Sequence, residues 1–337
     1  MYVPPKVKPL CPPEERPRFE DVPYARVTLD NGQAYTLKLD IYQSPEQNTP
    51  GPCIIYIFGG GFLWGEYKQV TQKAVYCRDL VRLTKEGYTV VCPDYRLGSQ
   101  SIFPACIHDV KGVVRFLKAN GEKYNIDPDR IGALGNSAGG CLASMLALSA
   151  NCRELEGEVG GNLEYDSSIK AAAIFYAPAD LCQSKWTAVR CGGIRTSAAA
   201  LSGPPKDLIG TEIENVGNDN AGIIPALIVG YTGPGRSLFT LNQVLERNDP
   251  GDPDWHFIEL TRKCSPVTYA GADCPPVAIF QGGRDTIVDP DQSEILYHAL
   301  VKAGADATFV ACSGGGHGPS LGEEIDQFAY NFLKKRL

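Results

Sequence analysis

Short apolar runs alternate with segments of helical periodicity along this chain, and no other feature of the sequence limits the fold as strongly. The runs at 53–58, 88–92 and 130–134 are as long as typical strands and apolar enough to be buried on both faces. Residues 68–86 and 105–123, which lie between them, have the apolar spacing of helices. This alternation predicts an α/β fold with a mostly parallel central sheet and helices on both faces. In such sheets, ligands bind beyond the carboxyl ends of the strands.

The same alternation continues along the chain. Further strands are predicted at 169–176, 276–281 and 307–312, and further helices from Ser137 to about residue 150, around 295–300 and around 321–332. The chain enters the sheet differently, because residues 24–41 alternate between apolar and polar around the turn sequence Asp30-Asn31-Gly32. This pattern predicts an antiparallel hairpin.

Two segments do not follow the alternation. Residues 1–23 contain seven prolines and no periodic pattern, which predicts an extended N-terminal arm. Residues 181–263 are rich in Gly, Pro, Asn and Asp, and they are too long for a bare loop in a compact domain. We expect an inserted lid or cap subdomain there, with the α/β domain formed by 24–180 and 264–337. Alternatively, apolar patches of the insertion serve a homo-oligomer contact.

Charge and hydropathy limit the partners of the protein. With 32 basic and 39 acidic residues the formal net charge is −7, and no block of Lys and Arg is longer than three residues. This argues against binding to nucleic acid or to anionic lipid. Prolines interrupt the first ten residues, where a signal peptide needs an apolar run, and no apolar stretch of 18 residues occurs. We expect a cytoplasmic protein that binds a small-molecule substrate and no membrane.

The chain has twelve cysteines, but they are scattered, and several lie inside apolar runs. Examples are Cys53, Cys92, Cys141 and Cys312. Free buried thiols are therefore expected in place of disulfides. No cysteine pair has the spacing of a zinc site, and no phosphate-binding or dinucleotide-binding glycine pattern is present. We expect neither a metal nor a cofactor.

The strongest chemical signal is the sequence Gly135-Asn136-Ser137-Ala138-Gly139-Gly140, which matches G-x-S-x-G. It lies between a predicted strand and an Ala/Leu-rich helix, as a nucleophile elbow requires. Glycines allow the tight turn, and the helix N-terminus behind Ser137 favours a developing negative charge. The alternative is an ordinary glycine-rich helix start with a capping serine.

A serine nucleophile needs a base, and the chain has only four histidines. Three of them, in predicted helices or in the insertion, are expected to be structural or at the surface: His108, His256 and His298. His317 lies in a glycine-rich loop directly after the strand at 307–312, at the edge of the sheet where Ser137 is expected. We therefore assign His317 as the base.

The base needs a carboxylate that holds its tautomer. Asp285 follows the strand at 276–281, and it stands between Ser137 and His317 in the chain, as in the order Ser, Asp, His. Asp289 is the rival, but Asp289-Pro290 is typical of the start of the next helix. We prefer Asp285.

Stabilising an oxyanion requires backbone donors that approach closely. Gly59-Gly60-Gly61 follows the buried strand at 53–58, and we assign the N–H groups of Gly60, Gly61 and Ala138 to this role. The alternatives are a plain glycine-rich turn or a phosphate cradle.

Six motifs together resemble those of a known family. They are Phe58-Gly-Gly-Gly-Phe62, Pro93-Asp94-Tyr95-Arg96-Leu97, Asp127-Pro-Asp-Arg130-Ile131, Gly135-Asn-Ser-Ala-Gly-Gly140, Gly283-Arg-Asp285 and Gly316-His317-Gly318. The set resembles the α/β-hydrolase fold, and more closely its carboxylesterases of the hormone-sensitive-lipase-like and bifunctional acetyl/feruloyl xylan esterase type. The resemblance covers about 24–180 and 264–337, and it implies a triad of Ser137, Asp285 and His317 with acyl-enzyme chemistry.

The chain departs from that family in two respects. Phe58 stands where the oxyanion motif usually begins with His, and the insertion at 181–263 is longer than in the compact xylan-esterase type. Asp94 and Arg96 match a family element near the site, and we expect a mutual or nearby structural ion pair.

We expect a serine hydrolase of short-acyl, acetyl-type esters. The resemblance implies acetylated fragments of plant polysaccharides or oligosaccharides, or hydroxycinnamate esters, as its substrates. Alternatively, Phe62, Trp64 and Trp186 line a general apolar pocket. Two other functions stay open: an amidase, formamidase-like or peptidase-like hydrolase with the same triad, and a non-catalytic binding module.

Overall fold

The computed structural model describes the whole chain except residues 1–15, 69–79, 183–227, 233–234, 237 and 319–320. The described strands form one sheet in the order β1-β2-β4-β3-β5-β6-β7-β8. The strands are β1 (Phe19–Thr28), β2 (Ala34–Tyr42), β3 (Gly51–Ile57), β4 (Thr89–Pro93), β5 (Ile126–Asn136), β6 (Ala172–Phe175), β7 (Val277–Gly282) and β8 (Ala307–Cys312).

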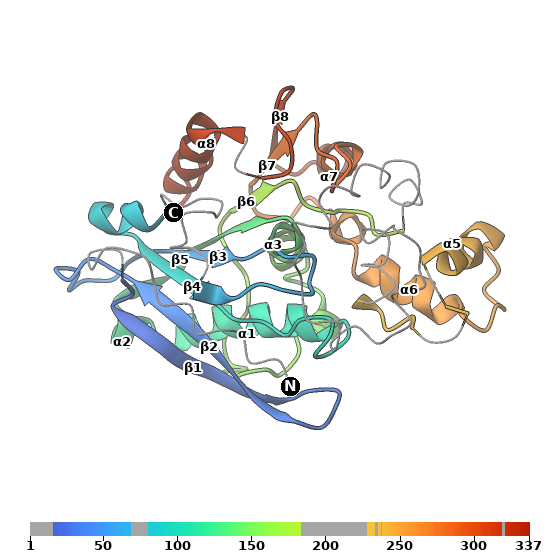
Figure 1. Cartoon of the computed structure of the whole chain (residues 1–337). Helices are drawn as coiled ribbons and strands as arrows, with labels where there is room; N and C mark the ends of the chain where they lie inside the picture. Colours follow the sequence, from blue (N-terminus) through green and yellow to red (C-terminus); the bar gives the residue numbers. More distant parts are fainter. Residues whose placement is uncertain (1–15, 69–79, 183–227, 233–234, 237, 319–320) are drawn as a thin grey trace.

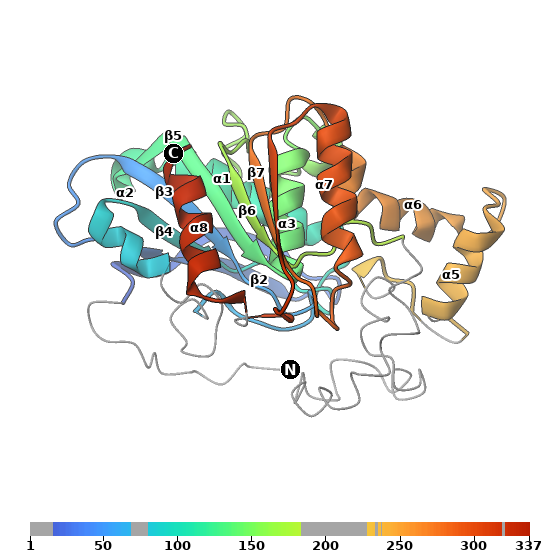
Figure 2. The ribbon, with the colours of Figure 1, turned by 90° about the horizontal axis from the view of Figure 1, so that it is seen from above.

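Helices cover both faces of this sheet, with α8 on one face and α1 and α3 on the other (Figures 1 and 2). The helices are α1 (Ala105–Ala119), α2 (Gly121–Tyr124), α3 (Ala138–Leu148), α5 (Leu238–Arg247), α6 (Trp255–Lys263), α7 (Asp291–Ala303) and α8 (Glu323–Lys334), with 3-10 helices η3 (Leu80–Glu86), η4 (Arg153–Leu155) and η9 (Pro266–Tyr269). This is the α/β-hydrolase arrangement that the sequence predicted.

The first part of the sheet is antiparallel and the rest is parallel. β1 pairs with β2 and β2 pairs with β4 in antiparallel register, whereas all pairs from β4 to β8 are parallel. The predicted hairpin is confirmed, but its first strand begins at Phe19, inside the predicted arm. Phe19 pairs with Ile41 and Val22 with Leu39, and register shifts before Val22 and after Pro23 accommodate the proline.

The parallel strands form the core, as their continuous apolar runs predicted. Every residue of β3, β4, β6 and β7 is buried. α3 is buried along its whole length because it is apolar on every side. It therefore holds the residue before it, Ser137, on a rigid support.

Two helix boundaries differ from the predictions. The predicted helix at 105–123 is divided at Asn120 into α1 and the short α2. At Gly121 a Cβ would lie 2.7 Å from the carbonyl oxygen of Ile126, so the chain turns tightly there toward β5. Of the helix predicted at 68–86, the structure describes only the two ends, and its last part is η3.

The described part of the insertion has an apolar cluster of its own. Seven buried side chains from α5, α6 and the segment before them make it up: Val229, Tyr231, Leu241, Val244, Trp255, Phe257 and Ile258. At the base of the insertion, the Leu181 N–H donates to the Ser265 Oγ at 2.9 Å. The chain therefore leaves and re-enters the α/β domain at one place, which fits an inserted subdomain whose limits stay a prediction.

The nine described cysteines are all free thiols, as expected. Five are buried: Cys53, Cys92, Cys106, Cys141 and Cys264. Cys312 is only partly buried, because β8 is an edge strand. In the described ranges, no helix combines the length and the apolar character that crossing a bilayer requires.

Candidate active site

Ser137 occupies the single residue between β5 and α3. Its backbone has φ 54° and ψ −124°, a conformation that L-residues rarely adopt and that costs free energy. Two hydrogen bonds hold it there: the Ser137 N–H donates to the Phe175 carbonyl at 2.9 Å, and the Ser137 carbonyl accepts from the Cys141 N–H at 3.0 Å. The chain therefore turns sharply from β5 into α3, as a nucleophile elbow requires.

The glycines around Ser137 are required by close packing. A Cβ at Gly135 would lie 2.2 Å from the Gly139 carbonyl oxygen, and a Cβ at Gly139 would lie 2.1 Å from the Ile57 carbonyl oxygen. No side chain fits at either distance. The glycines of the G-x-S-x-G motif are therefore required because Gly135 packs against Gly139, and Gly139 packs against β3.

Asp285 and His317 are brought together by the structure. The His317 Nδ1 lies 2.7 Å from the Asp285 Oδ2, and the Asp285 side chain is fully buried. The other carboxylate oxygen, Oδ1, accepts the backbone N–H groups of Ile287 at 2.8 Å and Val288 at 2.9 Å. With Nδ1 donating to the carboxylate, His317 Nε2 is left to accept a proton.

Asp289, the alternative to Asp285, lies at the start of α7. The Asp289 Oδ1 accepts the N–H of Asp291 at 3.1 Å, at the beginning of α7. It therefore fits the helix start that the sequence predicted for this residue.

The loops that carry Asp285 and His317 are joined by main-chain hydrogen bonds. The Gly283 N–H donates to the Cys312 carbonyl and the Arg284 N–H to the Gly315 carbonyl, both at 2.8 Å. These loops follow β7 and β8, and Ser137 follows β5, so all three residues lie beyond the carboxyl ends of parallel strands. The Tyr176 ring, which follows β6 between them, lies 4.5 Å from the His317 ring.

The glycine loop after β3 lies against the elbow. A Cβ on Gly59 would come 3.2 Å from the Ser137 Cβ. Gly60 has φ +113° and Gly61 has φ +60°, and a Cβ on Gly60 would lie 2.0 Å from the Trp64 carbonyl oxygen. Within the described chain, the N–H groups of Gly60, Gly61 and Ala138 donate to no other residue. Their assignment as oxyanion donors stays a prediction.

The three aromatic residues predicted to line a pocket have different surroundings. Phe62 is only 2% exposed and packs in the main core, with φ 61°. Trp64 is partly exposed, and Trp186 lies outside the described residues. A role in substrate binding stays a prediction for all three.

Ile228, in the described part of the insertion, contacts the segment that follows β4. The Phe103 N–H donates to the Ile228 carbonyl at 2.8 Å, and the Gly98 N–H donates to the Phe62 carbonyl at 2.7 Å. The segment after β4 therefore contacts both the insertion and the glycine loop. This contact is consistent with a cap at the rim of the site.

The expected ion pair near the site involves Arg96, but its partner is Asp109. The Arg96 Nη2 lies 2.7 Å from the Asp109 Oδ1, and the Arg96 Nε lies 2.9 Å from Oδ2, in a bidentate pair. Asp94 instead accepts the hydroxyl of Tyr35 at 2.6 Å and the N–H of Tyr95 at 3.0 Å. Burial, together with the nearby charge of Asp109, raises the pKa of Asp94 to about 7.

Sequence reasoning missed Asp109 because its partner is set by tertiary packing. An Asp on the apolar face of the helix at 105–119 was the only signal. In the described part of the chain, no group of three His, Cys, Asp or Glu side chains is arranged to hold a metal ion.

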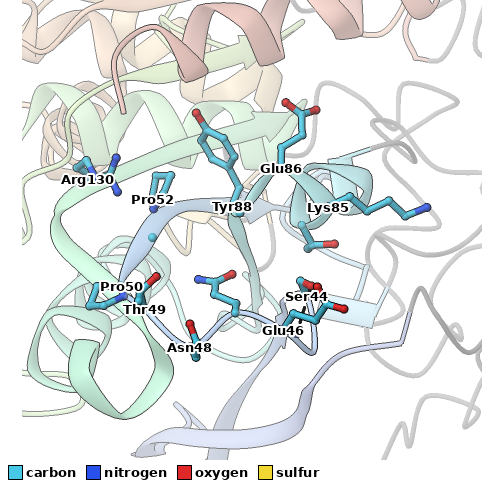
Figure 3. A pocket seen from close by; sticks show the side chains of 14 residues that line it. Ser44, Glu46, Asn48, Thr49, Pro50, Pro52, Lys85, Glu86, Tyr88 and Arg130 are labelled. Carbon is cyan, nitrogen blue, oxygen red and sulfur yellow. Dashed lines mark hydrogen bonds between the residues drawn. The ribbon is translucent and has the colours of Figure 1, made fainter.

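A cavity of about 500 Å³ opens at the opposite edge of the sheet (Figure 3). It is lined by the loop at 44–52, by residues 84–88 and by Arg130, close to the amino ends of β3 and β4. Because Ser137 lies beyond the carboxyl ends, this cavity is separate from the candidate active site.

Known proteins resemble this chain along most of its length. Esterase LipQ of Mycobacterium tuberculosis is 26% identical over 289 residues, which cover 85% of this chain and 53% of LipQ. Esterase LipC of the same organism is 24% identical over 285 residues, which cover 84% of this chain and 57% of LipC. This chain thus spans little more than half the length of these curated relatives.

A solved structure and a family model extend the comparison. A truncated form of carbohydrate esterase from gut microbiota shares the fold, with a TM-score of 0.70 and 24% identity, over 97% of this chain and 98% of that one. The family model BD-FAE matches residues 39–230 and 251–300, more than half of the chain. Since that match spans the strands and loops that position Ser137 and Asp285, the chain belongs to the BD-FAE family of α/β-hydrolase-fold proteins.

Proposed function

We propose that this protein is a serine carboxylic ester hydrolase that forms an acyl-enzyme on Ser137. The observation that carries the proposal is the 2.7 Å contact between the His317 Nδ1 and the buried Asp285 carboxylate. This pair lies at the same edge of the sheet as the strained Ser137 backbone. A histidine oriented by a carboxylate beside a serine on a tight turn is the arrangement that activates a hydroxyl.

In the proposed mechanism, His317 Nε2 takes the proton of the Ser137 hydroxyl as Oγ attacks the ester carbonyl carbon. The negative charge that forms on the carbonyl oxygen is stabilised by the N–H groups of Gly60, Gly61 and Ala138. His317 then gives the proton to the departing alcohol oxygen. A water molecule, deprotonated by His317, attacks the acyl carbon. The bond to the Ser137 Oγ then breaks, His317 returns the proton to Oγ, and the acid is released.

We infer a short acyl group and a carbohydrate alcohol as the substrate class. The likeness in fold to a carbohydrate esterase supports the carbohydrate part of this proposal. Phe58, Phe62 and Leu63 of the glycine loop are buried and offer little surface to a long acyl chain, which supports the short acyl group.

The test is turnover of p-nitrophenyl acetate by the wild type and by Ser137→Ala. We expect the substitution to lower kcat by about a thousandfold or more, since the nucleophile is lost. Ser144→Ala is the matched control, because Ser144 lies in the same helix and its hydroxyl only donates to the Gly140 carbonyl at 2.8 Å. If Ser137→Ala keeps most of the activity, the proposal is wrong.

Two further measurements separate the alternatives. A fluorophosphonate probe should label Ser137 of the wild type, whereas a non-catalytic binding module would remain unlabelled. A comparison of p-nitrophenyl acetate with p-nitroacetanilide should show faster cleavage of the ester, and the opposite result would favour an amidase. Release of acetate from acetylated xylo-oligosaccharides, compared with p-nitrophenyl octanoate, tests the substrate class.

A further inference from the structure

The carbonyl group at the start of the glycine loop is held by a buried tyrosine. The Tyr95 hydroxyl donates to the Phe58 carbonyl at 2.9 Å, and both residues are almost fully buried. Their rings are stacked, with centroids 4.3 Å apart and planes 21° apart. The ring of Phe58 in turn contacts Gly65, where a Cβ would lie 2.6 Å from it. Phe58 itself has no polar side chain, so its carbonyl is the polar group that fixes this end of the loop.

The C-terminal end of the glycine loop, at Phe62, is also held by the segment that follows β4. The Gly98 N–H donates to the Phe62 carbonyl at 2.7 Å. Between these two contacts lie three glycines, which have no side chains to anchor them. Inside the loop, the Leu63 and Trp64 N–H groups donate to the Gly60 carbonyl at 3.0 and 3.1 Å. The position of the loop therefore depends on the residues 95–98.

Tyr95 is itself held firmly. Its N–H donates to the Asp94 Oδ1 at 3.0 Å, and the Asp94 Oδ2 accepts the Tyr35 hydroxyl at 2.6 Å. Burial raises the pKa of Tyr95 well above its ordinary value, so the hydroxyl keeps its proton and remains a donor. A rigid donor of this kind can fix the direction of the peptide groups that follow Phe58.

We propose that Tyr95 is a positioning residue, whose hydroxyl orients the Gly60 and Gly61 N–H groups toward the oxyanion through the Phe58 carbonyl. The inference rests on the proposed ester hydrolysis. Without the Tyr95 hydroxyl, the Phe58 carbonyl would lose its buried hydrogen-bond donor. The Gly60 and Gly61 N–H groups would then shift away from their positions beside Ser137. Misplacement of donors by a fraction of an ångström weakens the stabilisation of the transition state more than the binding of the substrate.

The test is Tyr95→Phe, which removes only the hydroxyl. We expect kcat for p-nitrophenyl acetate to fall by about ten- to a hundredfold while KM changes by less than about threefold. The inhibition constant of an alkyl trifluoromethyl ketone, whose adduct with Ser137 carries an oxyanion, should rise by the same factor as kcat/KM falls.

Tyr269→Phe is the matched control. The Tyr269 hydroxyl donates to the Lys263 carbonyl at 2.8 Å, outside the glycine loop. This variant should lose similar thermal stability but keep kcat and the inhibition constant. Assays are run well below the lower Tm of the two variants, so that unfolding does not imitate the effect.

Hydrogen–deuterium exchange gives a readout that does not depend on turnover. The peptide that covers 58–65 should exchange faster in Tyr95→Phe than in the wild type, with no change in Tyr269→Phe. If Tyr95→Phe keeps the wild-type kcat, inhibition constant and exchange rate, the inference is wrong. If the wild type itself fails to hydrolyse esters, the proposed function is wrong. If, in that case, the exchange rate of the 58–65 peptide is also unchanged in Tyr95→Phe, the positioning of the loop by Tyr95 is wrong as well.

Discussion

Asp285→Asn should abolish most of the activity while leaving the shape of the site intact, and the hydrogen bonds of Asp285 explain why. The two carboxylate oxygens accept from four donors within the described residues. The Oδ1 accepts two backbone N–H groups at 2.8 and 2.9 Å, and the Oδ2 accepts from the Gln281 Nε2 at 3.2 Å and faces the His317 Nδ1 at 2.7 Å. An asparagine has only one acceptor oxygen to place among these donors.

The backbone donors decide how that asparagine is oriented. Because the N–H groups of Ile287 and Val288 cannot turn away, the amide oxygen should remain at the Oδ1 position. The amide NH₂ then faces His317, which must present an unprotonated Nδ1 and carry its proton on Nε2. In that tautomer His317 cannot accept the proton of Ser137, and we expect kcat to fall by about 10⁴-fold.

Steady-state kinetics with p-nitrophenyl acetate would measure this loss, and the rate of labelling by a fluorophosphonate probe should fall in parallel. Asp289→Asn is the matched control, because Asp289 accepts a backbone N–H at the start of α7 and an asparagine oxygen can do the same. We expect it to retain wild-type activity. A loss of less than tenfold in Asp285→Asn, or an equal loss in Asp289→Asn, would refute this assignment of the carboxylate.

Two further predictions concern stability. Gly139→Ala should lower the free energy of unfolding by about 3 kcal/mol, because its Cβ would lie 2.1 Å from the Ile57 carbonyl oxygen. Gly314→Ala is the control, because a Cβ there would meet open space, and its free energy of unfolding should not change. Thermal unfolding measures both. The pKa of Asp94 is raised from 3.8 to about 7, so the folded protein binds an extra proton between these values and becomes less stable as the pH rises through them. In denaturant titrations, the free energy of unfolding of the wild type should therefore be lower at pH 8 than at pH 5, by up to about 3 kcal/mol. The decrease should be smaller in Asp94→Asn. An equal decrease in both proteins would contradict the raised pKa of Asp94.

The sequence predicted those features that depend on local pattern. The hairpin, the buried parallel strands and the elbow around Ser137 each follow from periodicity or from glycine spacing over a few residues. The pairing of Asp285 with His317 followed from one further rule, that loops after parallel strands meet at one edge of the sheet. Both residues directly follow predicted strands, so their proximity could be inferred without knowledge of side-chain contacts.

Features set by packing between distant segments were missed. Phe19 belongs to β1 because it pairs with Ile41, and this contact outweighs the proline-rich composition around it. Arg96 pairs with Asp109 of α1, whereas the sequence predicted a pair with Asp94 or with a nearby residue that it did not identify. The Tyr95 hydroxyl contact with Phe58 joins two strand ends, and no spacing in the chain predicts it.

The hydrogen bond between Leu181 and Ser265 has a consequence for how such proteins can diverge. Since the two ends of the insertion already meet, the loop-closure part of its folding free energy rises by only about 0.6 kcal/mol for each doubling of its length. Segments of very different size can therefore be exchanged at this joint without altering the strands or the loops that carry Ser137, Asp285 and His317. The same scaffold can acquire a new rim while the positions of Ser137, Asp285 and His317 are left unchanged.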